Sequence, residues 1–240
     1  MSGEFLLRKL QAFGPLSAES QAAIIELGKN RLRSVKARQD IIREGDDPKD
    51  VYLITEGWAY RYKMLEGGDR QIIGIFLPGD LCDLHVYILK EMDHSIGALT
   101  ALRYTRISPA MLDEISDGHP RVIRALWWET LVSASIQREW TVNLGQRDAY
   151  QSLAHLCCEM FLRLRTVGLV ADNMCAFPLS HHDIADSLGL TQTHVGRVVR
   201  KLNESGHATL HRRQLFVHDL RGLQTAALFN PNYLHQNSDT

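Results

Sequence analysis

Short apolar runs separated by turn residues occupy the chain from Leu32 to about Ile107. The runs are rich in β-branched and aromatic residues, and clusters of glycine and acidic residues, such as residues 66–69 and 78–80, lie between them. Glycine and aspartate supply the backbone angles and side-chain caps that tight turns need. Many short strands at close spacing are typical of a sandwich, barrel or jelly roll. We predict strands over residues 40–42, 51–55, 58–64, 71–76, 96–101 and 103–107.

Helical spacing replaces this pattern after Pro109. From about Met111 to Asn143 the apolar residues recur at intervals of three and four, which predicts one long helix. A long helix with a wide apolar stripe needs a partner. It either only covers the β-domain, or covers it with one side and meets the same helix of a second copy with the other. We favour the second arrangement, a two-fold homodimer. The residues predicted to form the dimer contact are Val122, Ile123, Leu126, Trp127, Leu131, Ile136 and Trp140.

Two short helices with clear start and stop signals lie near the carboxyl end. Ser180 and Asp183 resemble a capping box at the start of a helix that Gly189 ends. Thr191 is a good N-cap for a second helix over residues 192–205. A short helix, a tight glycine turn and a capped second helix predict a helix-turn-helix.

The second of these helices has one apolar face and one basic face. Because a helix advances about 100° per residue, the apolar and the basic residues fall on opposite sides of it. Gly196 lets the backbone come close to a groove, and the major groove of DNA admits such a helix. Arginine pairs with guanine there and glutamine with adenine, so Arg197 is the leading candidate for base readout. The side chains predicted to be buried are Val195, Val198, Val199 and Leu202.

Residues 208–211 and 215–218 predict two short strands joined by a basic turn, which together form a hairpin wing. Basic side chains at its tip would meet phosphates. The alternative is a helical pair and hairpin whose basic face is merely solvated, but the order of the parts favours DNA binding. The predicted DNA-binding residues are Ser180, His181, Thr191, Gln192, Thr193, His194, Gly196, Arg197, Arg200, Lys201, Arg212 and Arg213.

Composition narrows the possibilities. A chain of 240 residues with 45% hydrophobic content can form two modest domains, and its net charge of −1 requires any DNA-binding surface to be a local basic patch. No signal peptide and no apolar run long enough to span a bilayer is visible, so we expect a cytoplasmic protein. The four cysteines predict neither a disulfide framework nor a zinc site. We expect Cys157 and Cys158, in a helix predicted over residues 147–165, to be core fillers.

The sequence resembles the Crp-Fnr superfamily of bacterial regulators from about Phe13 to Leu223. The most specific match is residues 183–191 (DIADSLGLT) running into residues 194–202 (HVGRVVRKL), which looks like the family's recognition motif. The resemblance implies an α+β fold with an N-terminal β-roll (jelly roll) sensor domain, a long dimerisation helix and a C-terminal winged helix-turn-helix. It also implies dimeric binding to an inverted repeat near a promoter and contact with RNA polymerase. The segments that resemble the cyclic-nucleotide-type sensor are residues 42–46, 51–54, 56–57 and 77–81.

Two sensing mechanisms of that family do not carry over. Cyclic-AMP-responsive members hold the phosphate with an Arg-Ser or Arg-Thr pair, whereas here the Gly79-Asp80-Leu81 turn leads into residues 91–95, whose acidic groups would repel it. Oxygen-sensing members use several N-terminal cysteines for an iron-sulfur cluster, and this chain has none before Cys82. We expect neither cyclic AMP nor an iron-sulfur cluster, so the effector is unknown: another small molecule, or none. Thr193 stands where members that read the best-known sites have glutamate, so we expect a different half-site.

Two other function classes compete with this interpretation. A cyclic-nucleotide-binding-like signalling module without DNA binding would not need the wing and the recognition helix. A cupin-like metalloenzyme would share the jelly roll but needs closely spaced histidines with a carboxylate, and the roll has no His-x-His. No nucleophile elbow, phosphate loop or dinucleotide fingerprint appears, so we predict no enzyme and no catalytic residue. Adjacent His181 and His182 diverge, and His85 and His94 stand alone, so we predict no metal site.

We therefore predict four parts: a cyclic-nucleotide-binding-like β-roll sensor domain over residues 1–110, a dimerisation helix and hinge over 111–145, a winged helix-turn-helix DNA-binding domain over 146–225, and a C-terminal tail over 226–240. The predicted function is a sequence-specific DNA-binding transcription regulator that binds an inverted-repeat promoter site as a homodimer. The operator, the regulated genes and the direction of regulation do not follow from the sequence.

Overall fold

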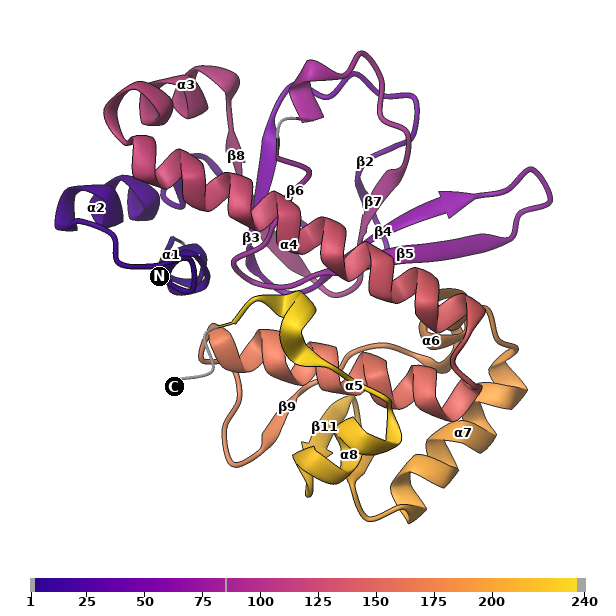
Figure 1. Ribbon diagram of the computed structural model, residues 1–240. Helices are drawn as coiled ribbons and strands as arrows, with labels where there is room; N and C mark the ends of the chain where they lie inside the picture. Colours follow the sequence, from indigo (N-terminus) through magenta and orange to yellow (C-terminus); the bar gives the residue numbers. More distant parts are fainter. Residues whose placement is uncertain (1–2, 85, 237–240) are drawn as a thin grey trace. The chain divides into compact units, whose positions relative to one another are not determined.

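The computed structural model describes residues 3–84 and 86–236, and their contacts form two compact units (Figure 1). Among the described residues, unit 1 holds those up to residue 63 and those from 74 to 134, and unit 2 holds residues 64–73 and 135–235. The tip of one β-hairpin therefore belongs to unit 2. The domain boundaries at residues 110, 145 and 225 stay sequence-based predictions.

Two sheets form an N-terminal β-roll. One has the strand order β1-β8-β3-β6 and the other the order β2-β7-β4-β5. The neighbours within them pair antiparallel, for example Leu53 of β3 opposite Thr105 of β8. The predicted class, a mixed fold with an N-terminal β-domain, is confirmed. The strands are β1 (Leu32–Val35), β2 (Asp40–Ile42), β3 (Val51–Glu56), β4 (Ala59–Met64), β5 (Arg70–Phe76), β6 (Leu81–Cys82), β7 (Ser95–Ala98) and β8 (Leu102–Ile107).

Unit 1 also holds three short helical segments outside the two sheets. They are α1 (Glu4–Gln11), α2 (Ala18–Leu27) and the 3-10 turn η1 (Val86–Ile88), none of which the strand pattern predicted. Leu6 and Ile24 from α1 and α2 have no exposed surface, and they pack in one cluster with strand residues of the roll. Burial of such side chains stabilises the unit by about 1.5–3 kcal/mol each.

The prediction of a single long helix over residues 111–143 is wrong. The structure has two helices instead, α3 (Pro109–Gly118) and α4 (Pro120–Gly145). Between them His119 has a φ of −135° and a ψ of 68°, which are not helical angles. Pro120 causes this break, because a proline ring disfavours helical angles in the residue before it and has no N–H to donate.

Three side chains predicted for the dimer contact are buried within their own chain. Val122 and Leu126 are 0% and 1% exposed and belong to the core of unit 1. Trp140 is 5% exposed, and its indole N–H donates to Glu159 at 3.1 Å. These three have no surface left to offer a second copy, and the prediction is corrected for them.

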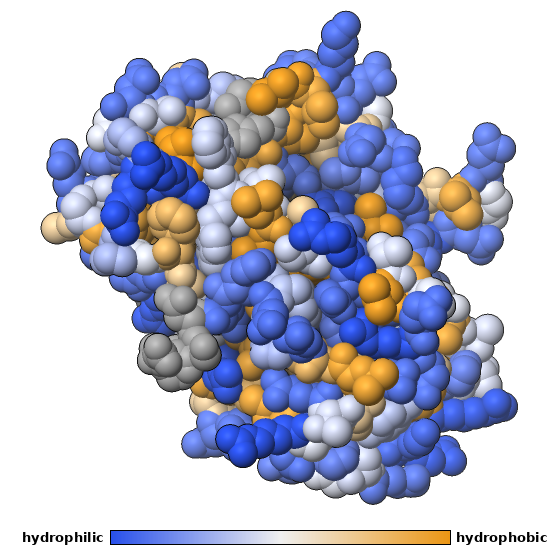
Figure 2. All heavy atoms as spheres, viewed as in Figure 1, coloured by the Kyte–Doolittle hydropathy of each residue, from blue (hydrophilic) through white to orange (hydrophobic). Residues whose placement is uncertain are grey.

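The remaining predicted dimer residues lie on more accessible parts of α4. Trp127 and Leu131 are 59% and 66% exposed, and Ile123 and Ile136 are half-buried. Figure 2 shows apolar surface interrupted by polar side chains on the face over α4. The candidate dimer contact thus reduces to Trp127 and Leu131, an exposed pair one helical turn apart, with Ile123 one turn before Trp127.

Unit 2 is built around α5 (Ala149–Thr166), in which residues 152–162 are all buried. Asp148 and Gln151 form a capping box at its start. The sheet of this unit has the order β10-β11-β9, with strands paired antiparallel. The other elements of the unit are β9 (Met174–Ala176), α6 (His181–Leu188), α7 (Gln192–Glu204), β10 (Ala208–His211), β11 (Gln214–Val217), α8 (Leu220–Ala226) and η2 (Pro231–Leu234).

A buried polar cluster ties the end of α4, α5 and the C-terminal segment of unit 2 together. Glu159 has no exposed surface and accepts hydrogen bonds from Arg163 at 2.9 Å and from the Tyr233 hydroxyl at 3.2 Å. Burial raises the pKa of Glu159, while Arg163 opposes that shift.

His155, also without exposed surface, lies next to this cluster and stacks on Tyr233 with ring centroids 5.6 Å apart. Burial, followed by the charge of Arg147, lowers the pKa of His155 to about 3. The imidazole is therefore neutral at pH 7.

Candidate nucleic-acid interface

The helix pair α6 and α7 begins and ends where its capping residues predict. At the start of α6, the Ser180 hydroxyl accepts from the Asp183 amide at 3.2 Å, and the Asp183 carboxylate accepts from the Ser180 amide at 2.9 Å. Gly189 ends α6 with a left-handed φ of 65°. The Thr191 hydroxyl then caps α7 by accepting from the His194 amide at 3.3 Å. These local bonds fix the angle at which α7 leaves the turn.

One face of α7 anchors it in unit 2. Val195, Val198 and Leu202 are 1%, 6% and 0% exposed. Val199, which we predicted on the same face, is only half-buried and lines a small cavity, so that assignment needs correction. Val199 lies one residue past Val198, about 100° around the helix, and therefore falls at the edge of the apolar stripe.

The opposite face of α7 is open to solvent, as its polar composition predicts. Ser180 is half-buried in its cap, and the half-buried Gly196 leaves the helix surface flat. Because α7 is held by its apolar face, the exposed side chains on the opposite face present a basic surface to solvent. The predicted DNA-binding side chains on or beside α7 that are exposed are His181, Thr191, Gln192, Thr193, His194, Arg197, Arg200 and Lys201.

Two neighbours of this surface have no signal in the local sequence. The Lys201 ammonium lies 4.7 Å from the centre of the Tyr150 ring, on α5, which gives a cation–π contact. Arg70, at the hairpin tip that belongs to unit 2, pairs with Asp186 of α6 at 2.7 Å. Both contacts join residues far apart in the chain, which a pattern of nearby residues does not reveal.

Replacing Gly196 by alanine is expected to raise the free energy of unfolding by about 0.5–1 kcal/mol, because glycine is a poor residue inside a helix. An added Cβ would lie 3.9 Å from the His181 ring, an ordinary contact, so the chain itself accommodates it. DNA affinity should fall in the same variant, because the methyl group projects into the approach to the groove. Thermal unfolding and a DNA titration check both effects. Unchanged affinity in a stabilised variant would contradict a close approach at Gly196.

The wing is a two-residue hairpin with arginines at its tip. His211 of β10 pairs with Gln214 of β11, which leaves Arg212 and Arg213 as the turn. Their φ angles are 48° and 63°, both positive, as in the type I′ turns whose twist matches paired strands. Both arginines are exposed, and Phe177 donates its amide to the carbonyl of Arg213 at 2.8 Å. The turn therefore holds two cations at a fixed position beside the helix pair.

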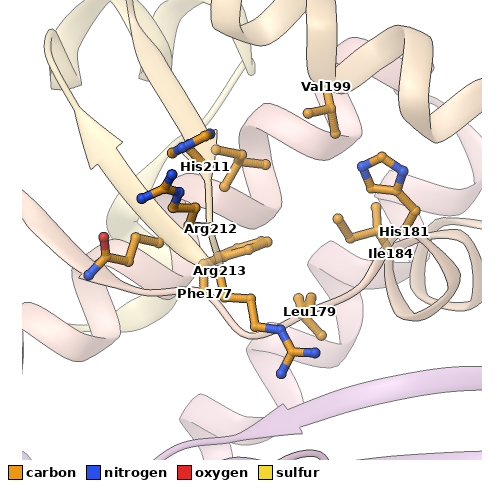
Figure 3. A pocket seen from close by; sticks show the side chains of 10 residues that line it. Phe177, Leu179, His181, Ile184, Val199, His211, Arg212 and Arg213 are labelled. Atoms are coloured by element: carbon orange, nitrogen blue, oxygen red, sulfur yellow. The ribbon is translucent and has the colours of Figure 1, made fainter.

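A cavity of about 140 Å³ lies between the helix pair and the wing (Figure 3). Its apolar wall includes Phe177, Leu179, Ile184 and Val199. The arginines of the wing tip line its other side. The arginines at the edge of this apolar wall are the kind of side chain that contacts DNA phosphates.

In the sensor turn of unit 1, the charge of the Asp80 carboxylate is already paired within the chain. The Asp80 carboxylate accepts the Leu77 amide at 2.7 Å and pairs with Lys9 of α1 at 2.5 Å. His94 of the same unit is 7% exposed and lies 2.8 Å from Asp83 and 2.6 Å from Asp93. His85 lies outside the described residues.

Arg61, also in unit 1, pairs with Asp83 and lies 5.0 Å from the centre of the Phe76 ring. To bind Lys9 or Arg61, an anionic ligand would have to displace a carboxylate of the chain.

All four cysteines are buried. Burial raises the pKa of the Cys82, Cys157 and Cys158 thiols, and that of Cys175 to about 12, so none is a thiolate at neutral pH. The described residues include no group of three or more histidine, cysteine or acidic side chains placed to hold a metal ion. Within the same residues, no helical stretch combines the length and apolarity that crossing a bilayer requires.

Two protein families match separate parts of the chain. Residues 32–119 match the cyclic nucleotide-binding domain, and residues 153–226 match the Crp-like helix-turn-helix domain. The second match covers the basic face of α7 and the wing.

Similar proteins span most of the chain. The transcriptional activatory protein AadR of Rhodopseudomonas palustris is 30% identical over 69% of this chain and 68% of its own length. The nitrogen fixation regulation protein FixK of Bradyrhizobium diazoefficiens is 29% identical over 70% of each chain. Among solved structures, FixK2 from Bradyrhizobium japonicum has a TM-score of 0.72 and 26% identity, and the match covers 82% of this chain and 96% of that one.

Proposed function

Since the chain belongs to the Crp-Fnr family and is a DNA-binding transcription regulator, we propose that it binds an inverted-repeat operator as a homodimer, with α7 of each copy in the major groove. One observation carries the proposal. α7 is anchored by three buried side chains on one face and presents an open basic face on the other. The relatives are named for regulation or transcriptional activation and not for catalysis, which agrees with a regulatory role.

A selection from random duplexes tests this function. Full-length protein is mixed with a library of random duplexes about four helical turns long, and the bound fraction is sequenced over several rounds. We expect enrichment of two half-sites in inverted orientation, with centres about one helical turn apart. Retention of DNA without any enriched sequence would contradict sequence-specific readout, and enrichment of a single half-site would contradict the dimer.

The wing arginines are proposed to contact phosphates rather than bases. Asparagine and glycine are the residues most compatible with a type I′ turn, so the double variant Arg212→Asn/Arg213→Gly removes both cations and keeps the hairpin. We expect weaker binding to all DNA sequences alike. The plot of log affinity against log salt concentration should also become less steep, by about one for each phosphate that the wing no longer binds. Titrations at several salt concentrations measure this. A weakening confined to one base pair would show that the wing reads sequence instead.

The dimer is proposed to form along the exposed residues of α4. Trp127 and Leu131 are spaced four residues apart and so share one side of the helix. Sedimentation at micromolar concentration is expected to give a dimer for the wild-type chain and a monomer for Leu131→Asp, because a charge in an apolar contact is costly. The control is Ser116→Asp, at an exposed position of α3. A dimeric Leu131→Asp variant would place the interface elsewhere.

The effector is proposed to be neither cyclic AMP nor an iron-sulfur cluster. The basic side chains near the sensor turn, Lys9, Arg61 and His94, already face carboxylates of the chain, so the residues do not fit a cyclic phosphate. Cys82 is the first cysteine of the sequence and is buried, which leaves too few ligands for a cluster. A different small molecule, or control by abundance alone, is compatible with this unit.

Contact with RNA polymerase at the promoter and a cytoplasmic location are also proposed, and both rest on family membership.

A further inference from the structure

The start of β5, next to the tip of the β4–β5 hairpin, contacts the first helix of the helix-turn-helix, and both parts belong to unit 2. Arg70, the first residue of β5, lies 2.7 Å from the Asp186 carboxylate through Nε and 3.2 Å from the Asp183 carboxylate through Nη2. The next residue, Gln71, donates its amide to the backbone carbonyl of Asp186 at 2.6 Å. The hairpin thus contacts α6 through ion pairs with two carboxylates and through a hydrogen bond to one backbone carbonyl of its last turn.

These ion pairs are shielded from water. The side chain of Arg70 is 15% exposed, and those of Asp183 and Asp186 are 0% and 12% exposed. Charged pairs in such surroundings interact more strongly than surface pairs, and breaking one by removing a single partner is unfavourable. Arg70 therefore fixes where the Asp186 carboxylate points.

From Asp186 the chain of contacts continues to the recognition helix. His182 Nε2 lies 3.6 Å from the Asp186 carboxylate, and His182 Nδ1 lies 3.1 Å from the side-chain amide nitrogen of Gln192, the first residue of α7. With the Gln192 amide nitrogen as the donor, Nδ1 of His182 is the acceptor, and Nε2 faces the Asp186 carboxylate.

This arrangement decides what Gln192 offers to DNA. One N–H of its amide is used by His182, which leaves one N–H and the carbonyl oxygen. Adenine recognition by glutamine in the major groove needs one donor and one acceptor. If His182 turned or took the other tautomer, the amide would have to rotate and would exchange its donor and acceptor.

We propose that Arg70 is a positioning residue for base readout: through Asp186 and His182 it fixes the side-chain amide of Gln192. The inference rests on the proposed function, because it takes Gln192 as a residue that reads a base. It adds a specific role for the hairpin tip. Strands β4 and β5 continue from this tip into unit 1.

The test compares base preference among single and double variants. The variants are Arg70→Met, which keeps the aliphatic stem without the charge, His182→Ala and Gln192→Ala, with Arg221→Met at an exposed position of α8 as the matched control. Each full-length protein is titrated with duplexes that carry each of the four bases at every position of the selected half-site. Gln192→Ala identifies the position that Gln192 reads, as the one where preference disappears.

We expect Arg70→Met and His182→Ala to reduce the preference at that same position by about two- to thirtyfold, the range in which residues remote from a ligand modulate coupling. Preferences at other positions should persist, and Arg221→Met should match the wild type. In the Gln192→Ala background, Arg70→Met should reduce base preference no further, because both changes act on the same amide.

A purely structural role for Arg70 gives a different result. The melting temperature of Arg70→Met is expected to fall, since Asp183 is buried, but a lowered melting temperature with unchanged base preference overturns the proposal. His182 is exposed, so His182→Ala tests the same path in a fully folded protein, and an unchanged preference there also overturns it. If Gln192→Ala itself leaves every preference intact, the assignment of Gln192 as a reading residue fails, and the path fails with it. Sequence-specific binding by Arg197 would be untouched by that outcome.

Discussion

Arg197→Ala is expected to weaken binding to the selected operator by about 1–3 kcal/mol and to relax selectivity at one guanine in each half-site. Arg197 is exposed on the side of α7 opposite the buried Val195 and Leu202, so its guanidinium is directed away from the protein. Two parallel N–H donors match O6 and N7 of guanine, and alanine leaves both acceptors without a partner. Titration of the wild-type and variant proteins against the operator and its single-base variants measures the change in affinity.

A charge-preserving control separates base readout from phosphate contact. Arg197→Lys keeps the positive charge but not the planar pair of donors, so we expect it to retain more affinity than alanine while losing most of the guanine preference. Arg221→Ala, at an exposed position of α8, should match the wild type. An equal weakening on all DNA sequences for Arg197→Ala would mean that Arg197 meets a phosphate.

His155 is expected to make unit 2 less stable as the pH falls. Its folded-state pKa is about 3, well below the ordinary value of 6.5, since burial and the charge of Arg147 both disfavour the imidazolium ion. Below pH 6.5 the unfolded chain takes up a proton that the folded chain does not. Stability is therefore fully present above pH 6.5 and declines between about 6.5 and 3, by about 1.4 kcal/mol per pH unit from this residue alone.

The variant His155→Gln removes this titration and keeps an acceptor for Asn143, whose amide lies 3.2 Å from His155 Nδ1. Chemical unfolding at a series of pH values from neutral to mildly acidic, followed by the fluorescence of the nearby Trp140, should show a shallower decline for the variant. His218→Gln, at an exposed site, should keep the wild-type pH slope. Identical slopes for His155→Gln and the wild type would contradict a buried neutral imidazole.

The helix-turn-helix could be predicted because its determinants are local. Ser180, Gly189 and Thr191 each act within three or four residues of their position, and the structure places caps and a left-handed turn there. The β-roll was predictable for a similar reason, since its turns are marked by glycine and acidic residues. The family resemblance was carried by these same segments.

Other features depend on contacts that no local pattern contains. Apolar spacing over α3 and α4 continues across Pro120, so periodicity alone predicted one helix, although the proline was a visible signal for the break. Spacing also shows which residues share a helix face without showing what covers that face. Val122 and Leu126 proved to face their own unit. The pair of Arg70 with Asp186 joins residues 116 positions apart, and only the folded chain brings them together.

The most direct test of base reading by α7 is methylation interference on the selected operator. Guanine N7 lies in the major groove, so methylating it blocks a helix that reads guanine there, whereas methylation of adenine N3 alters only the minor groove. We expect guanine N7 methylation in both half-sites to abolish binding of the wild-type protein, and Arg197→Ala to become insensitive to it at one guanine. Binding that tolerates N7 methylation throughout, or that responds only to minor-groove methylation, would contradict the placement of α7 in the major groove.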